Sequence, residues 1–129
     1  MKPDEFIDYA ELLAVQPTVI PPQARSITSR AYYGAFHLAA SFVASLTKVK
    51  HSKHDAHVWL LASRHPDAFE AGKLLAMLNN NRIKADYRLE DSRVELPAAA
   101  RMNVECARDV QRLLIRCENV PVEEIVTRR

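Results

Sequence analysis

The chain has 129 residues, of which 48% are hydrophobic and 26% are charged, and this length and composition fit one globular domain with a substantial core. Lysine and arginine number 18 against 16 acidic residues, and a net charge of +2 does not by itself indicate a nucleic-acid-binding protein. Only two residues are glycine, which argues against a β fold with many turns and favours long helices joined by short loops.

Apolar residues recur at helical spacing in five segments, at about residues 3–15, 23–47, 55–63, 67–87 and 97–118. Prolines separate these segments except between 23–47 and 55–63, because proline ends a helix that precedes it and is tolerated in the first turn of the helix that follows. We therefore expect an all-α fold, a four- to five-helix up-and-down bundle in which residues 1–118 form a single domain. Residues 119–129 are expected to be a flexible tail.

The first two predicted helices differ in how much of their surface is apolar. Residues 3–15 carry one apolar face, formed by Phe6, Tyr9, Ala10 and Leu13. Residues 23–47 carry two apolar stripes side by side: Ile27, Ala31, Ala35, Leu38, Phe42 and Leu46 in one, and Tyr32, Phe36, Ala39 and Val43 in the other. A helix that is apolar over half of its circumference is expected to be the central helix of the bundle.

Between the second and fourth helices lies a basic segment with three histidines, His51, His54 and His57. Zinc requires neutral imidazoles in a tight tetrahedron, and the neighbouring lysines oppose a further cation, so we predict no metal site. The segment is expected to be a solvated loop, with contact to RNA phosphates as the alternative. Trp59, which follows it, is predicted to anchor the core.

The last predicted helix, 97–118, carries a single apolar stripe, formed by Ala99, Met102, Cys106, Val110, Leu113 and Cys117. The two cysteines are about 16 Å apart on this helix at 1.5 Å per residue, too far for a disulfide. We expect both to be buried, reduced thiols, which indicates a cytoplasmic protein. Residues 1–5 lack the apolar core of a signal peptide, and no apolar run reaches the ~18 residues that cross a membrane.

Two motifs carry a family resemblance. Residues 29–40 read SRAYYGAFHLAA and residues 82–87 read RIKADY. The first resembles the SRAYYxAFH signature of the HEPN superfamily, the higher eukaryote and prokaryote nucleotide-binding domain, and the second resembles the RxKADY element of one branch of that superfamily. The resemblance implies a helical bundle that forms a homodimer.

Many HEPN proteins are metal-independent ribonucleases, some of them toxins paired with a nucleotidyltransferase antitoxin, and their catalytic motif is Arg-x4-6-His. In this sequence Arg82 matches the arginine, Tyr87 stands where the histidine would fall, and no histidine follows Arg82. The resemblance therefore implies an RNA- or nucleotide-binding module of a toxin–antitoxin or defence system that lacks this motif and needs no cofactor. Two alternatives remain: a metal-independent ribonuclease that uses Arg82 with Tyr87 or His37, and a non-enzymatic protein-interaction scaffold.

Arg82 is the main candidate for a ligand-binding residue. It continues an apolar stripe of the helix at 67–87, formed by Ala71, Leu75, Leu78 and Ala85, where a charge requires a partner. Asn79 and Asp86 lie three residues before and four after it, so both can flank the guanidinium. Arg82 would neutralise a phosphate, Asp86 would orient Arg82, and Tyr87 would donate a hydrogen bond or stack. The alternative is an internal Arg82–Asp86 ion pair that fixes helix packing.

Arg30, Tyr33 and His37 fall within about 60° of one another on the helix at 23–47. They could form a polar pocket that faces the helix at 67–87 or a partner subunit. His37 could act there as an acid or base, because the unperturbed pKa of histidine is about 6.5. The alternative is that all three are ordinary bundle residues, with Arg30 extended to solvent.

Overall fold

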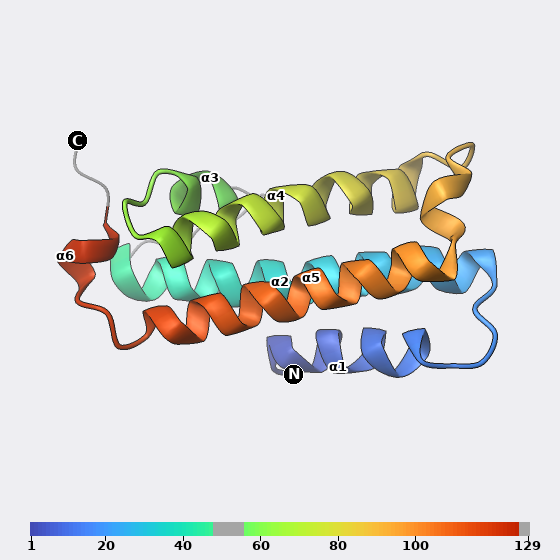
Figure 1. The fold of residues 1–129 in the computed structure, drawn as a ribbon, viewed down its shortest axis with the longest axis horizontal. Coiled ribbons are helices and arrows are strands. Elements are labelled where there is room, and N and C mark those ends of the chain that lie inside the picture. Colours follow the sequence, from blue (N-terminus) through green and yellow to red (C-terminus); the bar gives the residue numbers. More distant parts are fainter. Residues whose placement is uncertain (48–55, 127–129) are drawn as a thin grey trace.

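The computed structural model describes residues 1–47 and 56–126. Within these ranges the chain is helical and contains no strand, so the predicted all-α bundle is confirmed (Figure 1). No helix there combines the length and the apolar character that a membrane span requires. The elements are α1 (Pro3–Ala14), α2 (Pro21–Thr47), α3 (Ala56–Leu61), α4 (Pro66–Tyr87), the short 3-10 helix η1 (Ser92–Glu95), α5 (Pro97–Cys117) and α6 (Val122–Ile125).

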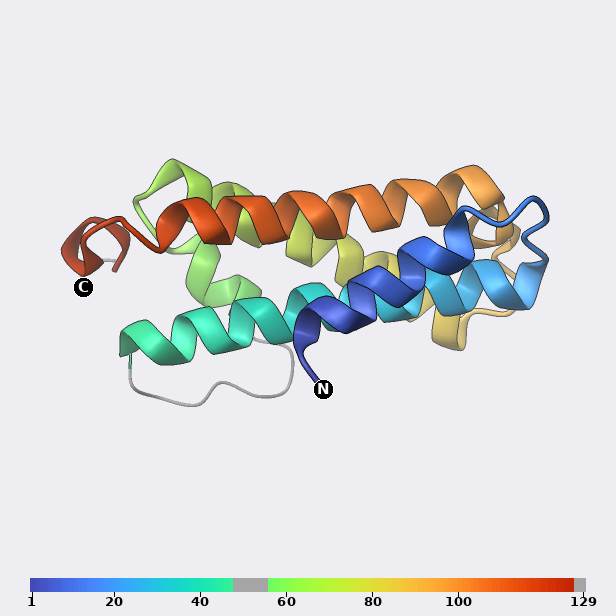
Figure 2. The same ribbon diagram turned by 90° about the horizontal axis from the view of Figure 1, so that it is seen from below.

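The four long helices run up and down along one axis, and α2 lies at the centre. It contacts α1, α4 and α5, as its two apolar stripes predict. Figure 1 shows α4 on one side of the α2–α5 pair and α1 on the other. Seen from below, α1 lies over the line between α2 and α5 and covers only part of their length (Figure 2).

Proline sets the start of each long helix. Pro3, Pro21, Pro66 and Pro97 are each the first residue of their helix, where the missing N–H would have had no intrahelical partner. The predicted starts therefore lie within two residues of the observed ones. The loop before α5 contains η1, whose N-cap Asp91 accepts a hydrogen bond from the Arg93 backbone N–H.

The predicted buried faces of α1 and α5 are partly wrong. Ala10 is buried as predicted, but Tyr9 is 52% exposed, and Ile7 and Ala14, which were not predicted, are buried. Met102 is 66% exposed, while the polar Asn103 beside it is buried. Tertiary contacts explain both differences. Ile7 packs closely against Gly34 of α2, and α5 contacts α1, α2 and α4, which rotates its buried face away from Met102.

Part of the segment expected to be a flexible tail is packed against the bundle. Ile125 of α6 is fully buried, and the Ser63 hydroxyl donates a hydrogen bond to its carbonyl oxygen. Four residues are too few to show a periodic pattern, so the sequence does not reveal α6. Residues 127–129, the predicted loop at 48–55, and with it His51 and His54, lie outside the described residues.

Other predictions about the core are confirmed. Cys106 and Cys117 are free and buried, and burial raises the pKa of the Cys106 thiol to about 12 and that of Cys117 to about 11. Trp59 is half-buried and packs against the core. The expectation that His51, His54 and His57 form no metal site stays a prediction, because His51 and His54 lie outside the described residues.

Candidate anion-binding site

Arg82 lies in the interior of the bundle, where α4 faces α2. Only 7% of the residue is exposed. Its guanidinium carbon is 5.1 Å from the centre of the Tyr32 ring and 5.7 Å from that of Tyr33. The cation is therefore stabilised by two aromatic faces in a largely water-excluded place.

The hydrogen bonds of the Arg82 guanidinium are incomplete. Its Nη2 donates to Asn79 Oδ1 at 2.8 Å, whereas its Nη1 is 3.9 Å from Asp86 Oδ2, an ion-pair separation that is too long for a hydrogen bond. Nε is buried and has no hydrogen-bond partner in the structure. Asn79 and Asp86 thus flank Arg82 as their spacing predicts, but a buried donor without a partner costs roughly 1–3 kcal/mol.

Asp86 sits at the rim of this site. Its side chain is 28% exposed, and the Ser29 hydroxyl of α2 donates to Asp86 Oδ2 at a long 3.4 Å. Neither contact holds the carboxylate tightly. It can therefore turn toward solvent without breaking a strong bond.

The Tyr32 phenol does not neutralise the Arg82 charge. Burial raises the pKa of Tyr32 to about 12, although Arg82 acts in the opposite direction. The phenol is therefore protonated at neutral pH, and Tyr32 offers Arg82 a ring and a hydroxyl rather than an anion. Sequence reasoning placed Tyr32 only in an apolar stripe and missed this role.

A row of rings leads from the Arg82 site to the outer surface of α2. The half-buried Tyr33 ring covers Arg82, and its centre is 6.5 Å from the ring of the exposed His37. His37 in turn stacks on Phe6 of α1, with 5.8 Å between ring centres. The structure therefore places His37 beside Tyr33, on the side that faces α1.

The two remaining candidate residues, Arg30 and Tyr87, lie at the surface of the protein. Arg30 is exposed and lines a shallow pocket between α1 and α2, together with Tyr9, Leu13, Pro22, Gln23 and Ser26. Tyr87 is exposed at the last position of α4, directly after Asp86. Arg82, Asn79, Asp86 and Tyr33 therefore come together, whereas Arg30 lines a pocket that contains none of them.

A second arginine, Arg25 of α2, fixes the end of α4 and was missed from the sequence. Its Nε donates to Glu95 at 2.9 Å. Its two terminal nitrogens donate to five backbone carbonyl oxygens, those of Lys84, Ala85, Arg88, Leu89 and Asp91. No local pattern marks this residue, because all of its acceptors are 59 or more positions away in the chain.

A buried polar network joins three helices on the other side of α4. Asn81 Nδ2 donates to Asn103 Oδ1 at 2.8 Å, and Asn103 Nδ2 donates to Thr28 Oγ1 at 3.0 Å. The network fixes the relative positions of α2, α4 and α5. It thereby helps to fix the position of α4 at which Arg82 lies over the rings of Tyr32 and Tyr33.

Comparison of the chain with protein-family models, curated proteins and solved structures gave no match. The fold defines an all-α helical bundle with a buried, incompletely paired arginine at the α2–α4 interface. The HEPN resemblance accordingly depends on the two sequence motifs.

Proposed function

We propose that this chain is a HEPN-type module that binds a phosphate group of RNA or of a nucleotide at Arg82. The observation that carries the proposal is a buried guanidinium with an unpaired Nε, whose nearest carboxylate is 3.9 Å away. A phosphate offers several strong acceptors in the planar arrangement that a guanidinium matches. The resemblance adds a homodimer, a nucleotidyltransferase-type antitoxin as partner, and a role in a toxin–antitoxin or defence system.

In this proposal the anion takes the place of the Asp86 carboxylate. Asp86 turns outward from its exposed position at the rim, and the Ser29 hydroxyl, which now points at Asp86, donates to the incoming oxygen. Asn79 keeps its hydrogen bond to Nη2 and holds the guanidinium in place. The ligand therefore exchanges a loose ion pair for a charge-assisted hydrogen bond.

The rings next to Arg82 suit a nucleotide better than a free phosphate. Tyr33, His37 and Phe6 form a continuous row that begins at Arg82, and each base that stacks on an aromatic side chain contributes about 1–3 kcal/mol. The exposed Tyr87 could provide a further ring at the end of α4. This arrangement favours single-stranded RNA, whose bases are free to stack.

The proposal can be tested with a fluorescein-labelled single-stranded RNA of mixed sequence, followed by fluorescence anisotropy. Arg82→Met keeps the bulk of the side chain and removes its donors and charge, and it should weaken binding at least about tenfold and reduce the salt dependence by about one phosphate contact. Arg112→Met, on the exposed side of α5, is the matched control and should change binding less than about twofold. Equal affinities for the two variants would refute the proposal.

Asp86→Asn is a second test of the proposal in the same binding experiment, because it removes the negative charge that competes with the ligand for Arg82. The variant should bind the same RNA several-fold more tightly than the unmodified chain. Weaker binding by Asp86→Asn would mean that the carboxylate orients Arg82 and is not displaced.

The ribonuclease alternative has one supporting observation, the position of His37 beside Tyr33, which covers Arg82. Incubation of the RNA with the protein in a metal chelator distinguishes the two functions. Intact RNA supports a binding module. Cleavage that disappears in both Arg82→Met and His37→Ala would establish a metal-independent ribonuclease.

A further inference from the structure

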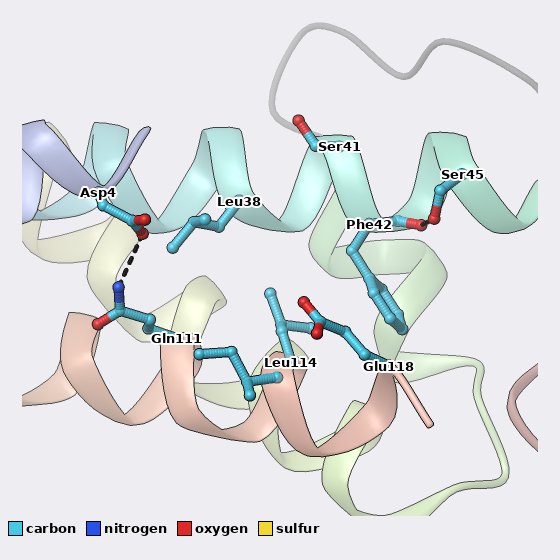
Figure 3. Close-up of a pocket in the computed structure, with 9 residues that line it drawn as sticks. Asp4, Leu38, Ser41, Phe42, Ser45, Gln111, Leu114 and Glu118 are labelled. Atoms are coloured by element: carbon cyan, nitrogen blue, oxygen red, sulfur yellow. Dashed lines mark hydrogen bonds between the residues drawn. The ribbon is translucent and has the colours of Figure 1, made fainter. Parts of the chain in front are cut away.

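A groove between α2 and α5 remains open beyond the start of α1. It forms a pocket of about 390 Å³, which is within the size range of ligand pockets. The side chains that line it come from α2 and α5, with one from the first turn of α1 (Figure 3). They are Asp4, Leu38, Ser41, Phe42, Ser45, Gln111, Leu114, Ile115 and Glu118.

The pocket continues the interface that α1 makes with the same two helices. α1 buries Ile7, Ala10 and Ala14 against α2 and α5, and the pocket begins at its first turn, where Gln111 Nε2 donates to Asp4 Oδ1 at 2.7 Å (Figure 3). From Gln111 of α5 to Glu118, the residue that caps its C-terminus, the chain extends about 10 Å, or two helical turns. The open part therefore matches a short helix that follows the course of α1.

The charges of the pocket select the kind of helix that fits. Asp4 and Glu118 place two carboxylates along it, and none of its lining residues is a lysine or arginine. Among the described residues, Glu118 has no ion-pair partner. An apolar floor with acidic ends is complementary to a helix with apolar residues on one side and basic residues beside them.

A second copy of this chain does not meet that requirement through its own α1. The helix carries four acidic residues, Asp4, Glu5, Asp8 and Glu11, and no basic residue. Its carboxylates would face Glu118 and repel it. The α1 helix of a second copy is therefore not complementary to this groove, and the charges favour a different polypeptide.

We propose that the α2–α5 groove binds a short basic amphipathic helix of a partner protein. Apolar side chains of that helix would contact Leu38, Phe42 and Leu114, and a lysine or arginine would pair with Glu118. The groove is lined by residues of α2, α5 and the first turn of α1, whereas Arg82 of α4 lies over the Tyr32 ring of α2.

The test uses the complete chain and a labelled model peptide of about 14 residues, made of leucine and lysine at amphipathic helical spacing. Binding is measured by fluorescence anisotropy, and a peptide with glutamate in place of lysine gives the charge-reversed comparison. We expect micromolar binding of the basic peptide and at least about tenfold weaker binding of the acidic one. No binding of the basic peptide, or equal binding of the two peptides, would overturn the proposal.

Two variants test whether the peptide binds in this groove. Ser41 is exposed at its edge, so Ser41→Trp should fill the groove, abolish binding and leave the melting temperature almost unchanged. Glu118→Lys should weaken binding about tenfold, and Glu105→Lys, an equal charge change elsewhere on α5, should not. Binding that survives Ser41→Trp, or a dimer in sedimentation that Ser41→Trp dissociates, would refute a partner helix in this groove.

Discussion

Arg25 provides a quantitative test of how the end of α4 is held. Its side chain is largely buried, and all three of its nitrogens donate hydrogen bonds, to Glu95 and to the last carbonyl groups of α4 and the loop that follows. The last carbonyls of a helix have no intrahelical partner. Arg25 supplies these partners from α2 and adds a positive charge at the negative end of the α4 dipole.

The cost of removing Arg25 follows from the burial of its bonds. Four of the six hydrogen bonds are partly buried, and two are exposed and can be replaced by water. At roughly 0.5–1.5 kcal/mol for each buried bond, Arg25→Met should lower the free energy of unfolding by about 3 kcal/mol. Arg25→Lys should cost about 2 kcal/mol, because an ammonium group keeps the charge but cannot reach so many acceptors.

The assay is urea denaturation followed by helical circular dichroism, together with hydrogen exchange of residues 88–95. Arg101→Met is the matched control, because Arg101 makes a single bond, to the Ala14 carbonyl oxygen at 3.0 Å, and its loss should cost about 0.5–1 kcal/mol. Arg25→Met should also speed exchange in 88–95, whereas Arg101→Met should not. Equal costs for the two variants would show that the Arg25 bonds contribute little.

Three further perturbations follow from the core. Asn103→Ala leaves two polar partners of the buried network unpaired and should lower the free energy of unfolding in urea by about 2–3 kcal/mol. Gly72→Ala places a Cβ 2.9 Å from the backbone nitrogen of Leu61, and this overpacking should cost about 1–3 kcal/mol and appear as a lower melting temperature. Burial raises the pKa of Cys106 to about 12 and that of Cys117 to about 11, from a usual 9.0, so the thiols of the unfolded chain ionise first. Stability in urea should therefore hold below pH 9 and fall as the pH rises from 9 to about 12, and a double Cys→Ala variant should lose this component.

The helices of this chain could be predicted because their signals are local. Proline marks the start of each long helix, and apolar spacing marks its length, so both can be read from neighbouring residues. Which face of a helix is buried could not be predicted in the same way. Met102 and Asn103 are adjacent, and only the position of α5 among three other helices decides that the amide is buried and the thioether exposed.

In the candidate site, too, the contacts within one helix could be predicted from the sequence and the contacts between helices could not. Asn79 and Asp86 are within four residues of Arg82 on one helix, so helical spacing alone predicts that they flank it. Tyr32 and Ser29 reach the site from α2, fifty or more positions away. Such contacts depend on the register between α2 and α4, which the network around Asn103 sets and which no periodic pattern encodes.

Arg25 and Arg82 lie at the same interface between α2 and α4, and they differ in how their donors are used. Arg25 donates from Nε and from both terminal nitrogens, to five carbonyls and a carboxylate. Arg82 is no less buried, yet its Nε has no partner and its carboxylate is 3.9 Å away. A guanidinium needed only for packing could have been replaced by an apolar side chain at little cost or even a gain in stability. The unpaired Nε of Arg82 and its distant carboxylate therefore favour a site that an anion completes, and this contrast is the physical reason to begin functional tests at Arg82.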